Sequence, residues 1–296
     1  MAASIEFGTS LPAVQQIPAR ARSWERAVGG REIIAAAQAA EAAGCAYVSC
    51  SDHPLIPISR AEAMGATWYD AGSTLAFVAG ATQRVRLLSH VLVVPYRHPL
   101  IVAKQYGTLD HLSGGRVILG VGSGHLKPEF RTLGADYERR GLVTDEYLQA
   151  IAAAWEHEVA AFVGETVRFR DVMISPRPAQ RPRPPIWVGG NSGAALRRAA
   201  RLGDGWIPWE LTPEMFAPLA ERARTLRAES GRSGAFALVA PLGAAADADA
   251  ADVAATARRW RSAGATAFHV GLGAGSFDEF LDRLAWLGRE VMPRVE

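Results

Sequence analysis

Apolar residues follow two alternating patterns along the chain. Short runs rich in β-branched residues predict buried strands, and longer segments with apolar residues three to four positions apart predict helices. The predicted strands span residues 5–12, 46–53, 85–95, 116–124, 184–190, 205–211, 235–243 and 267–275. The predicted helices span residues 31–44, 70–82, 99–115, 144–156, 192–203, 212–231, 251–264 and 276–292. Eight strand–helix units predict a TIM (β/α)8 barrel, an α/β fold, as one domain over residues 1–296.

Two details refine this pattern. Residues 162–184 break the alternation, and they predict a hairpin around Gly164-Glu165 followed by a proline-rich segment before the fifth strand. Thr144 and Thr212 are expected to cap the helices that they precede. Glu129 and Arg140 are expected to form a structural ion pair.

The carboxyl ends of barrel strands are where such enzymes carry their chemistry. Asp52-His53 ends the second strand, and the pair fits a catalytic role, a metal site or a simple turn cap. Ser89-His90 interrupts an apolar strand, which indicates a bulge where backbone faces a ligand. The other small or polar residues at strand ends are Ser10, Gly122, Ser123, Gly124, Gly189, Gly190, Asn191, Glu210, His269 and Gly271.

The sequence lacks the residues or motifs that are typical of several enzyme classes. The two lysines, Lys104 and Lys127, fall in a predicted helix and a loop, so a Schiff-base strand lysine is missing. No P-loop or G-x-S-x-G motif occurs, and His125 replaces the third glycine of a dinucleotide fingerprint. A metal-dependent hydrolase stays open if Asp52, His53 and His90 converge, although no ligand spacing marks them.

Two glycine-rich strand ends fit a ligand. Gly189-Gly190-Asn191-Ser192 leads into a helix, where exposed N–H groups and absent side chains suit a phosphate. An ordinary glycine turn with a serine cap would have the same residues. The small residues 122–124 leave room for a flat molecule at the top of the fourth strand.

Composition and charge limit the kinds of molecule that the protein is expected to bind. The net charge is +2, and no basic run interleaved with aromatic residues suggests nucleic acid. No apolar run reaches the roughly 18–20 residues of a membrane span, and the N-terminus shows no secretory leader. Two cysteines are too few for a disulfide framework. We expect a cytoplasmic homodimer that acts on a small molecule.

Four segments together resemble the bacterial luciferase-like superfamily of flavin- and deazaflavin-dependent oxidoreductases, whose fold is a TIM barrel. They are "SDH" at residues 51–53, the stretch at 98–124, "EFRTLG" at 129–134 and the stretch at 184–208. Each is weak alone, and their combination is specific. The Asp-His pair resembles the branch that uses the deazaflavin coenzyme F420, in which the imidazole handles the proton that accompanies hydride transfer.

This resemblance implies roles for particular residues. His53 would handle the proton, and Asp52 would orient and polarise it. A non-proline cis bond is expected within residues 89–91, and most of all between His90 and Val91. The implied cofactor contacts are Ser89, His90, Val91, Gly122, Ser123, Gly124, Gly189, Gly190, Asn191 and Ser192. Ser10, His125 and Trp209 are expected in the substrate pocket.

The sequence departs from the family pattern near the predicted site, and three alternative functions stay open. His125 stands where sugar-phosphate dehydrogenases of the branch have a glutamate, and Pro54-Leu55 follows His53 where they soon have a tryptophan. A sugar-phosphate substrate is therefore not expected. The alternatives are an FMN-dependent monooxygenase that uses reduced flavin and oxygen, a metal-dependent hydrolase, and a flavin-binding barrel without turnover.

Overall fold

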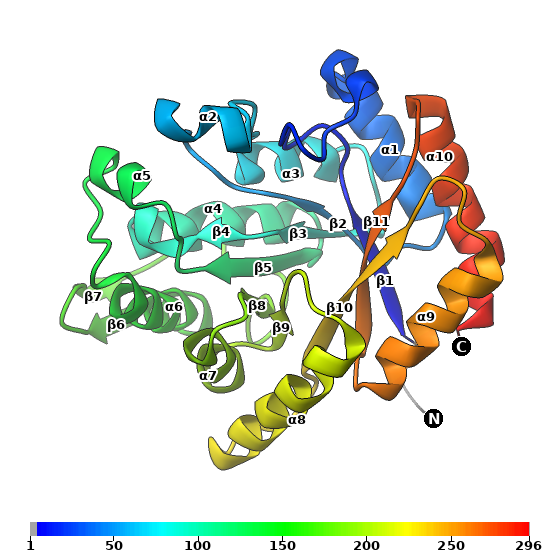
Figure 1. Cartoon of the computed structure of the whole chain (residues 1–296). Coiled ribbons are helices and arrows are strands. Elements are labelled where there is room, and N and C mark those ends of the chain that lie inside the picture. The colour runs from blue at the N-terminus through cyan, green and yellow to red at the C-terminus, as the bar shows by residue number, and fades with distance from the viewer. Residues whose placement is uncertain (1–4, 296) are drawn as a thin grey trace.

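The computed structural model describes residues 5–295 and shows parallel strands closed into a barrel with helices around it (Figure 1). The barrel strands are β1 (Glu6–Ser10), β2 (Tyr47–Cys50), β3 (Arg86–Ser89) continued by β4 (Leu92–Val93), β5 (Val117–Gly122), β8 (Ile186–Gly189), β9 (Gly205–Ile207), β10 (Ala237–Ala244) and β11 (Ala267–Leu272). They pair in the order β3-β2-β1-β11-β10-β9-β8-β5, and the pairing of β3 with β5 closes the ring. The predicted TIM barrel is confirmed.

Helices cover the outer face of the barrel (Figure 1). They are α1 (Gly30–Ala42), α2 (Ile58–Met64), α3 (Ala71–Ala79), α4 (Pro99–Leu112), α5 (Lys127–Thr132), α6 (Arg140–Glu156), α7 (Gly193–Leu202), α8 (Pro213–Glu229), α9 (Ala250–Ser262) and α10 (Phe277–Trp286). The short helices α2 and α5 follow β2 and β5, and the sequence pattern did not predict them.

The two predicted helix caps have different outcomes. Thr212 caps α8, since its side chain accepts a hydrogen bond from the Met215 N–H. The prediction for Thr144 is wrong, because α6 begins at Arg140 and the buried Thr144 hydroxyl donates to the Arg140 carbonyl inside the helix. A hydroxyl that satisfies the preceding turn is compatible with a helix interior.

The inside of the barrel is filled by a layer of apolar side chains, which we call the inner layer. Its residues are Tyr47, Leu88, Ile118, Trp187, Ile207, Val239 and Ala267. Because side chains alternate across a strand, the residues two positions further along lie above this layer, toward the carboxyl ends. The inner layer thus closes the barrel below and leaves the carboxyl-terminal mouth for chemistry.

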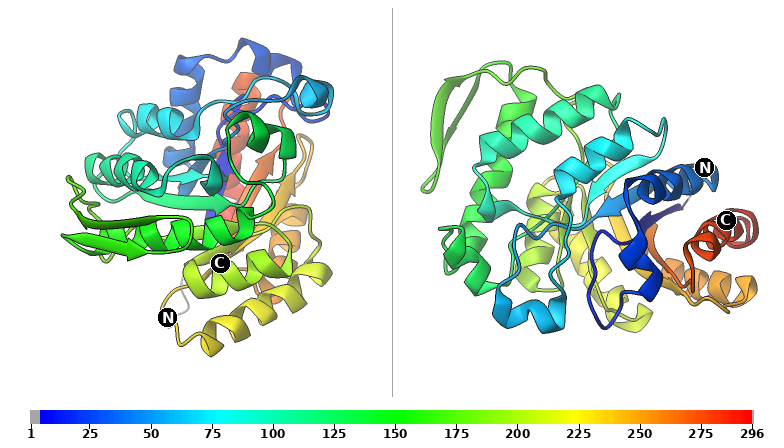
Figure 2. Two further views of the ribbon diagram at one scale, coloured as in Figure 1. Left: turned by 90° about the vertical axis from the view of Figure 1, so that its left-hand side faces the viewer. Right: turned by 90° about the horizontal axis from the view of Figure 1, so that it is seen from above.

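The predicted insertion before the fifth strand is confirmed. β6 (Ala160–Val163) and β7 (Arg168–Val172) pair antiparallel, and the hairpin projects from the barrel wall (Figure 2). Glu146 of α6 holds its turn, because its carboxylate accepts hydrogen bonds of 2.7 Å from the N–H groups of Glu165 and Thr166. The hairpin is therefore fixed to a barrel helix.

Candidate active site

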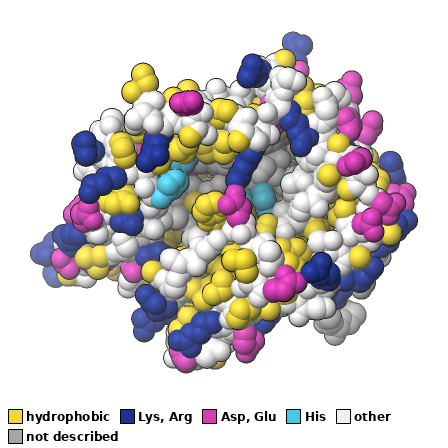
Figure 3. Space-filling view, in the orientation of Figure 1, with side chains coloured by type: hydrophobic (Ala, Val, Ile, Leu, Met, Phe, Trp, Pro, Cys, Tyr) yellow, Lys and Arg dark blue, Asp and Glu magenta, His cyan; other side chains and the backbone are white. Residues whose placement is uncertain are grey.

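The predicted site residues from the strand ends gather at the carboxyl-terminal mouth of the barrel. This face of the molecule is hollowed, and histidine side chains lie in the hollow (Figure 3). The hollow is bordered by the loops that follow β1, β2, β5 and β9. Long connections after barrel strands are where this architecture places its active sites.

His53 follows β2 and is held by a carboxylate. Its Nδ1 lies 3.0 Å from Oε2 and 3.3 Å from Oε1 of Glu129, a fully buried residue of α5. The Tyr96 hydroxyl donates to Oε2 of Glu129 at 2.7 Å. Trp68 packs its ring edge-on at 4.5 Å from the imidazole. These contacts fix the ring and leave Nε2 of His53 without a partner among residues 5–295.

Asp52 does not support His53, so the expectation that it orients the imidazole is wrong. Its carboxylate receives two hydrogen bonds from Arg97, at 2.7 and 2.9 Å. Burial raises the pKa of Asp52, and the Arg97 guanidinium opposes that rise. Arg97 also contacts Asp70 at 3.4 Å. Asp52 therefore anchors the strand end beneath His53 through a buried ion pair.

Glu129 takes the role that was expected of Asp52. The predicted ion pair of Glu129 with Arg140 is wrong, since the Arg140 guanidinium instead stacks on Tyr137 with its central carbon 4.0 Å from the ring centre. Sequence reasoning expected the supporting carboxylate from Asp52 and noted only His125 directly after the small-residue loop. The structure supplies it four residues later, from a short helix that α/β periodicity alone does not indicate.

His125 lies beside His53, as expected of a mouth residue. The two ring centres are 6.1 Å apart and the rings are perpendicular. Loss of solvent lowers the pKa of His125, and the neighbouring His53 acts in the same direction. A neutral imidazole next to His53 can accept or donate a hydrogen bond to a bound molecule.

The predicted non-proline cis bond is confirmed at His90-Val91. It separates β3 from β4. A Cβ added to Gly122 or Gly189 would come within 2.8 or 2.9 Å of a Val91 methyl group, so these two glycines make room for the bulge. The Ser89 side chain is fully buried and bonds both the N–H and the carbonyl of Gly120, so its hydroxyl does not reach the mouth.

The small-residue loop beyond β5 packs closely against its own helix. Gly124 has φ +75°, and a Cβ there would meet Phe130 and Val93 at 2.7 Å. Ser123, beside it, is half-buried. The conformation of Gly124 thus lets the chain turn from β5 toward α5, which carries Glu129.

The turn before α7 has the form of an anion site. Gly190 has φ +112°, a backbone conformation that glycine adopts readily. The Ser192 hydroxyl caps α7 by accepting from the Ala195 N–H at 3.2 Å. The N–H groups of Ser192, Gly193 and Ala194 precede the first intrahelical bond and are available to a ligand.

Asn191 and Trp209 form one unit at the rim. The Asn191 side chain bonds the N–H and the carbonyl of Trp209 at 3.1 and 2.7 Å. Both ends of the Asn191 side-chain amide therefore contact the Trp209 backbone, which holds this side chain at the rim. The Trp209 side chain is 58% exposed, which leaves it on the rim instead of in the core.

Ser10, at the end of β1, faces the inside of the mouth. Its hydroxyl lies 3.0 Å from Nε2 of His269 and 3.2 Å from the Ser49 hydroxyl. Sequence reasoning counted His269 among the strand-end residues but gave it no role. The alternation of inward residues along β11 is the signal that could have placed it there.

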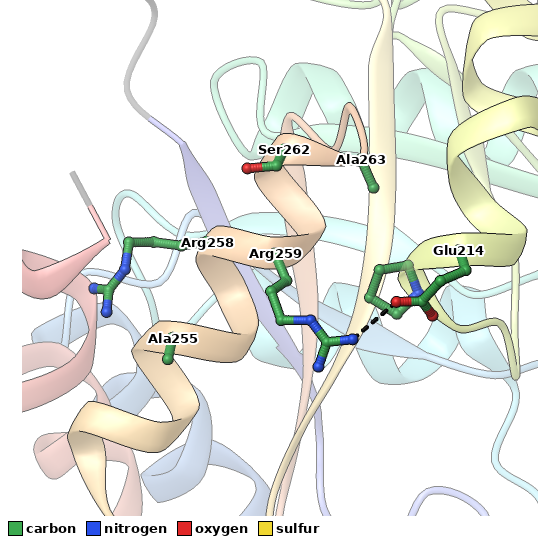
Figure 4. Close-up of a pocket in the computed structure, with 7 residues that line it drawn as sticks. Glu214, Ala255, Arg258, Arg259, Ser262 and Ala263 are labelled. Atoms are coloured by element: carbon green, nitrogen blue, oxygen red, sulfur yellow. Dashed lines mark hydrogen bonds and ion pairs between the residues drawn. The ribbon is translucent and has the colours of Figure 1, made fainter.

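Two other features lie outside this mouth. A surface hollow of about 430 Å³ lies between the start of α8 and the end of α9, where Glu214 pairs with Arg259 at 2.8 Å (Figure 4). It contains none of the predicted site residues. Within residues 5–295, no group of three or more His, Cys, Asp or Glu side chains is arranged to hold a metal ion.

Comparison with known proteins identifies the family. Residues 5–290 match the model described as luciferase-like monooxygenase. The chain belongs to the luciferase-like monooxygenase family. Membership accounts for the barrel, and for the enzyme class of oxidoreductases and monooxygenases to which the chain is assigned. No helix in the described part of the chain has the length and apolarity needed to cross a membrane.

The proteins that this chain is similar to carry different cofactors in their names. The uncharacterized protein Rv0940c of Mycobacterium tuberculosis is 34% identical over 212 residues, which cover 68% of this chain and 73% of that protein. The FMNH(2)-dependent dimethylsulfone monooxygenase of Pseudomonas putida is 35% identical over 130 residues, 43% of this chain and 36% of that protein. The structure of an F420-dependent secondary alcohol dehydrogenase shares 16% identity with a TM-score of 0.79, covering 99% of this chain and all of that chain, and shows the shared fold.

Proposed function

We propose that the protein transfers a hydride between coenzyme F420 and an organic substrate, and that His53 handles the accompanying proton. The observation that carries this proposal is the contact between Nδ1 of His53 and the buried carboxylate of Glu129. Positioned imidazoles are the commonest proton carriers in enzymes, and they work near neutral pH. The F420-dependent alcohol dehydrogenase of the same fold gives further support.

The residues at the mouth fit such a cofactor. The turn of Gly190, Asn191 and Ser192 would bind a phosphate through backbone N–H groups, and the bulge at His90-Val91 would lie against the ring. Ser123 and Gly124 would border the ring from the end of β5. Bound F420 would supply or accept the hydride.

The hydrogen bond to Glu129 decides which nitrogen of His53 can react. When Nδ1–H donates to Glu129, Nε2 carries the free lone pair and can take the proton of a substrate hydroxyl. In the opposite direction, a doubly protonated ring gives its Nε2 proton to a substrate oxygen, and Glu129 offsets the charge. Tyr96 fixes the carboxylate, and its pKa is raised by burial and by Glu129, so it remains a donor.

An FMN-dependent monooxygenase is the second candidate, because the dimethylsulfone monooxygenase of P. putida names reduced FMN. The same turn before α7 would bind the FMN phosphate. His53 would then serve as acid or base during oxygen chemistry. A metal-dependent hydrolase has no support among the described residues, and a flavin-binding barrel without turnover would leave the His53–Glu129 pair without a role.

Parallel titration of the purified protein with F420 and with FMN tests the proposal. We expect F420 to bind at least tenfold more tightly, a difference of about 1.4 kcal/mol. Equal or tighter binding of FMN would overturn the F420 assignment, and oxygen uptake with reduced FMN would then support the monooxygenase. The homodimer stays a prediction, and sedimentation of the same sample measures it.

A further inference from the structure

A cluster of uncharged polar side chains forms the floor of the mouth. On β1 and β2 the inward residues above the inner layer are Ser10 and Ser49, and on β11 the corresponding residue is His269. His90, two positions after Leu88 of the inner layer, comes from the other side of the barrel. We call these four residues the polar floor.

The polar floor has hydrogen-bonding capacity that the described protein does not use. Nε2 of His269 bonds Ser10 at 3.0 Å, but its Nδ1 is buried and has no partner within residues 5–295. The centres of the His90 and His269 rings are 4.4 Å apart, and the ring planes make an angle of 73°. Neither nitrogen of the His90 ring has a hydrogen-bond partner among residues 5–295. Buried polar atoms in folded proteins are nearly always paired, so an unpaired one needs an explanation.

The polar floor is also neutral. Burial lowers the pKa of His90 to about 4 and holds the pKa of His269 well below its usual range, with His90 acting in the same direction. Both imidazoles therefore carry one donor and one acceptor nitrogen at neutral pH. The buried carboxylates of Asp52 and Glu129 are engaged elsewhere, Asp52 with Arg97 and Glu129 with His53.

Open space lies above His269. The next inward residue of β11 is Gly271, which pairs in register with Gly243 of β10. A Cβ added to either glycine would have no heavy atom within 4 Å. These two positions without side chains leave open space at the ends of β10 and β11, on the mouth side of His269.

We propose that the polar floor is a binding subsite for an uncharged group with hydrogen-bonding capacity, such as a carbonyl, hydroxyl or amide, and that it rejects carboxylates and ammonium groups. A neutral site can form hydrogen bonds with such a group. An ion bound in the same place would leave a buried charge unpaired. This inference deepens the proposed function and rests on it, since it defines a chemical class for a molecule bound in the same mouth. The group can belong to the substrate or to the ring edge of the cofactor.

Three small molecules of the same shape test whether the polar floor prefers an uncharged group. The measurement needs neither cofactor nor turnover. Acetamide is neutral, acetate is an anion and acetamidinium is a cation of the same shape. The chain has seven histidines, so imidazole nitrogen NMR at pH 7.5 can follow each ring. We expect acetamide to shift the His90 and His269 resonances saturably, and each ion to bind at least tenfold more weakly.

Variants assign the effect to the polar floor. His269→Phe should weaken acetamide binding at least tenfold, and His157→Phe, at the exposed end of α6, should leave it unchanged. Acetate binding as tight as acetamide, or no saturable shift at His90 and His269, would overturn the inference. If His269→Phe does not fold, the shifts in the parent protein still decide the question.

A second titration identifies the source of the group. If saturating F420 shifts the same two resonances and displaces acetamide, the ring edge of the cofactor occupies the polar floor. If acetamide still binds in the presence of F420, the floor belongs to the substrate. Failure of F420 to bind would count against the proposed function alone, because the acetamide result does not depend on it.

Discussion

His53 and its two acidic neighbours have separable roles at the scale of single residues. We expect His53→Ala to lower turnover by about 10²- to 10⁴-fold, the usual contribution of a positioned acid or base, and to change cofactor affinity only a few-fold. Glu129→Gln should lower turnover less, because an amide can still hold the ring but cannot offset its charge. Steady-state kinetics and cofactor titration of each variant measure both effects.

Asp52→Asn provides the contrast for those variants. It breaks a buried ion pair with Arg97, so we expect the free energy of unfolding to fall by about 3 kcal/mol while the folded enzyme keeps most of its turnover. Urea unfolding and specific activity test this. A folded Asp52→Asn protein as inactive as His53→Ala would instead place Asp52 in the chemistry.

His90 should make stability depend on pH. An unfolded imidazole takes up its proton near pH 6.5, whereas His90 in the folded chain does so at about 4. Between these values the unfolded state binds more protons, so stability falls as pH falls, by up to about 3 kcal/mol for this group. His269 acts in the same direction.

Urea unfolding at pH 7, 5.5 and 4.5 measures that slope. His90→Asn should show a smaller loss of stability on acidification than the parent protein. His157→Asn, which alters an exposed histidine, should keep the parent slope. Equal slopes in the parent and in His90→Asn would show that His90 is not buried as a neutral ring.

At the scale of elements, the start of α7 is the feature to test. Ser192→Asp keeps an N-cap acceptor for Ala195 but adds a negative charge where the cofactor phosphate would bind. We expect helix stability to be retained and cofactor affinity to fall at least tenfold. Ser192→Asn, a neutral cap of the same shape, is the matched control and should bind cofactor within a few-fold of the parent.

The two Ser192 variants also show which result would contradict the phosphate site. If Ser192→Asp binds the cofactor as well as Ser192→Asn does, the phosphate lies elsewhere and the turn is only a capped glycine bend. Thermal unfolding of both variants shows whether the helix is intact. The comparison holds for F420 and FMN alike, because both cofactors carry a phosphate.

At the scale of the whole molecule, one ion pair joins two sides of the mouth. Arg20, in the loop after β1, contacts Glu210, in the loop after β9. β11 and β10 lie between those strands in the ring, so the pair spans part of the opening. Both side chains are more than half exposed, and such pairs contribute at most about 1 kcal/mol.

Breaking the pair should therefore affect access more than stability. We expect Glu210→Gln to change the free energy of unfolding by less than about 1 kcal/mol and to speed cofactor release several-fold. Stopped-flow fluorescence of bound F420 measures release. Glu214→Gln, which breaks an exposed pair on the outer wall, is the control, and an equal change in both variants would exclude a role for the mouth pair.

The sequence by itself determined the barrel, its hairpin, the glycine turn before α7 and the place of His53 at a strand end. Those features depend on local patterns, namely strand and helix periodicity, turn residues and position along a strand. The tertiary structure decided which side chains contact the predicted site residues. Glu129 meets His53 from 76 residues away, Arg97 meets Asp52 from 45, and Ser10 meets His269 from 259. Sequence order does not specify which side chains converge when eight strands close into a ring, so these contacts appear only in the folded barrel.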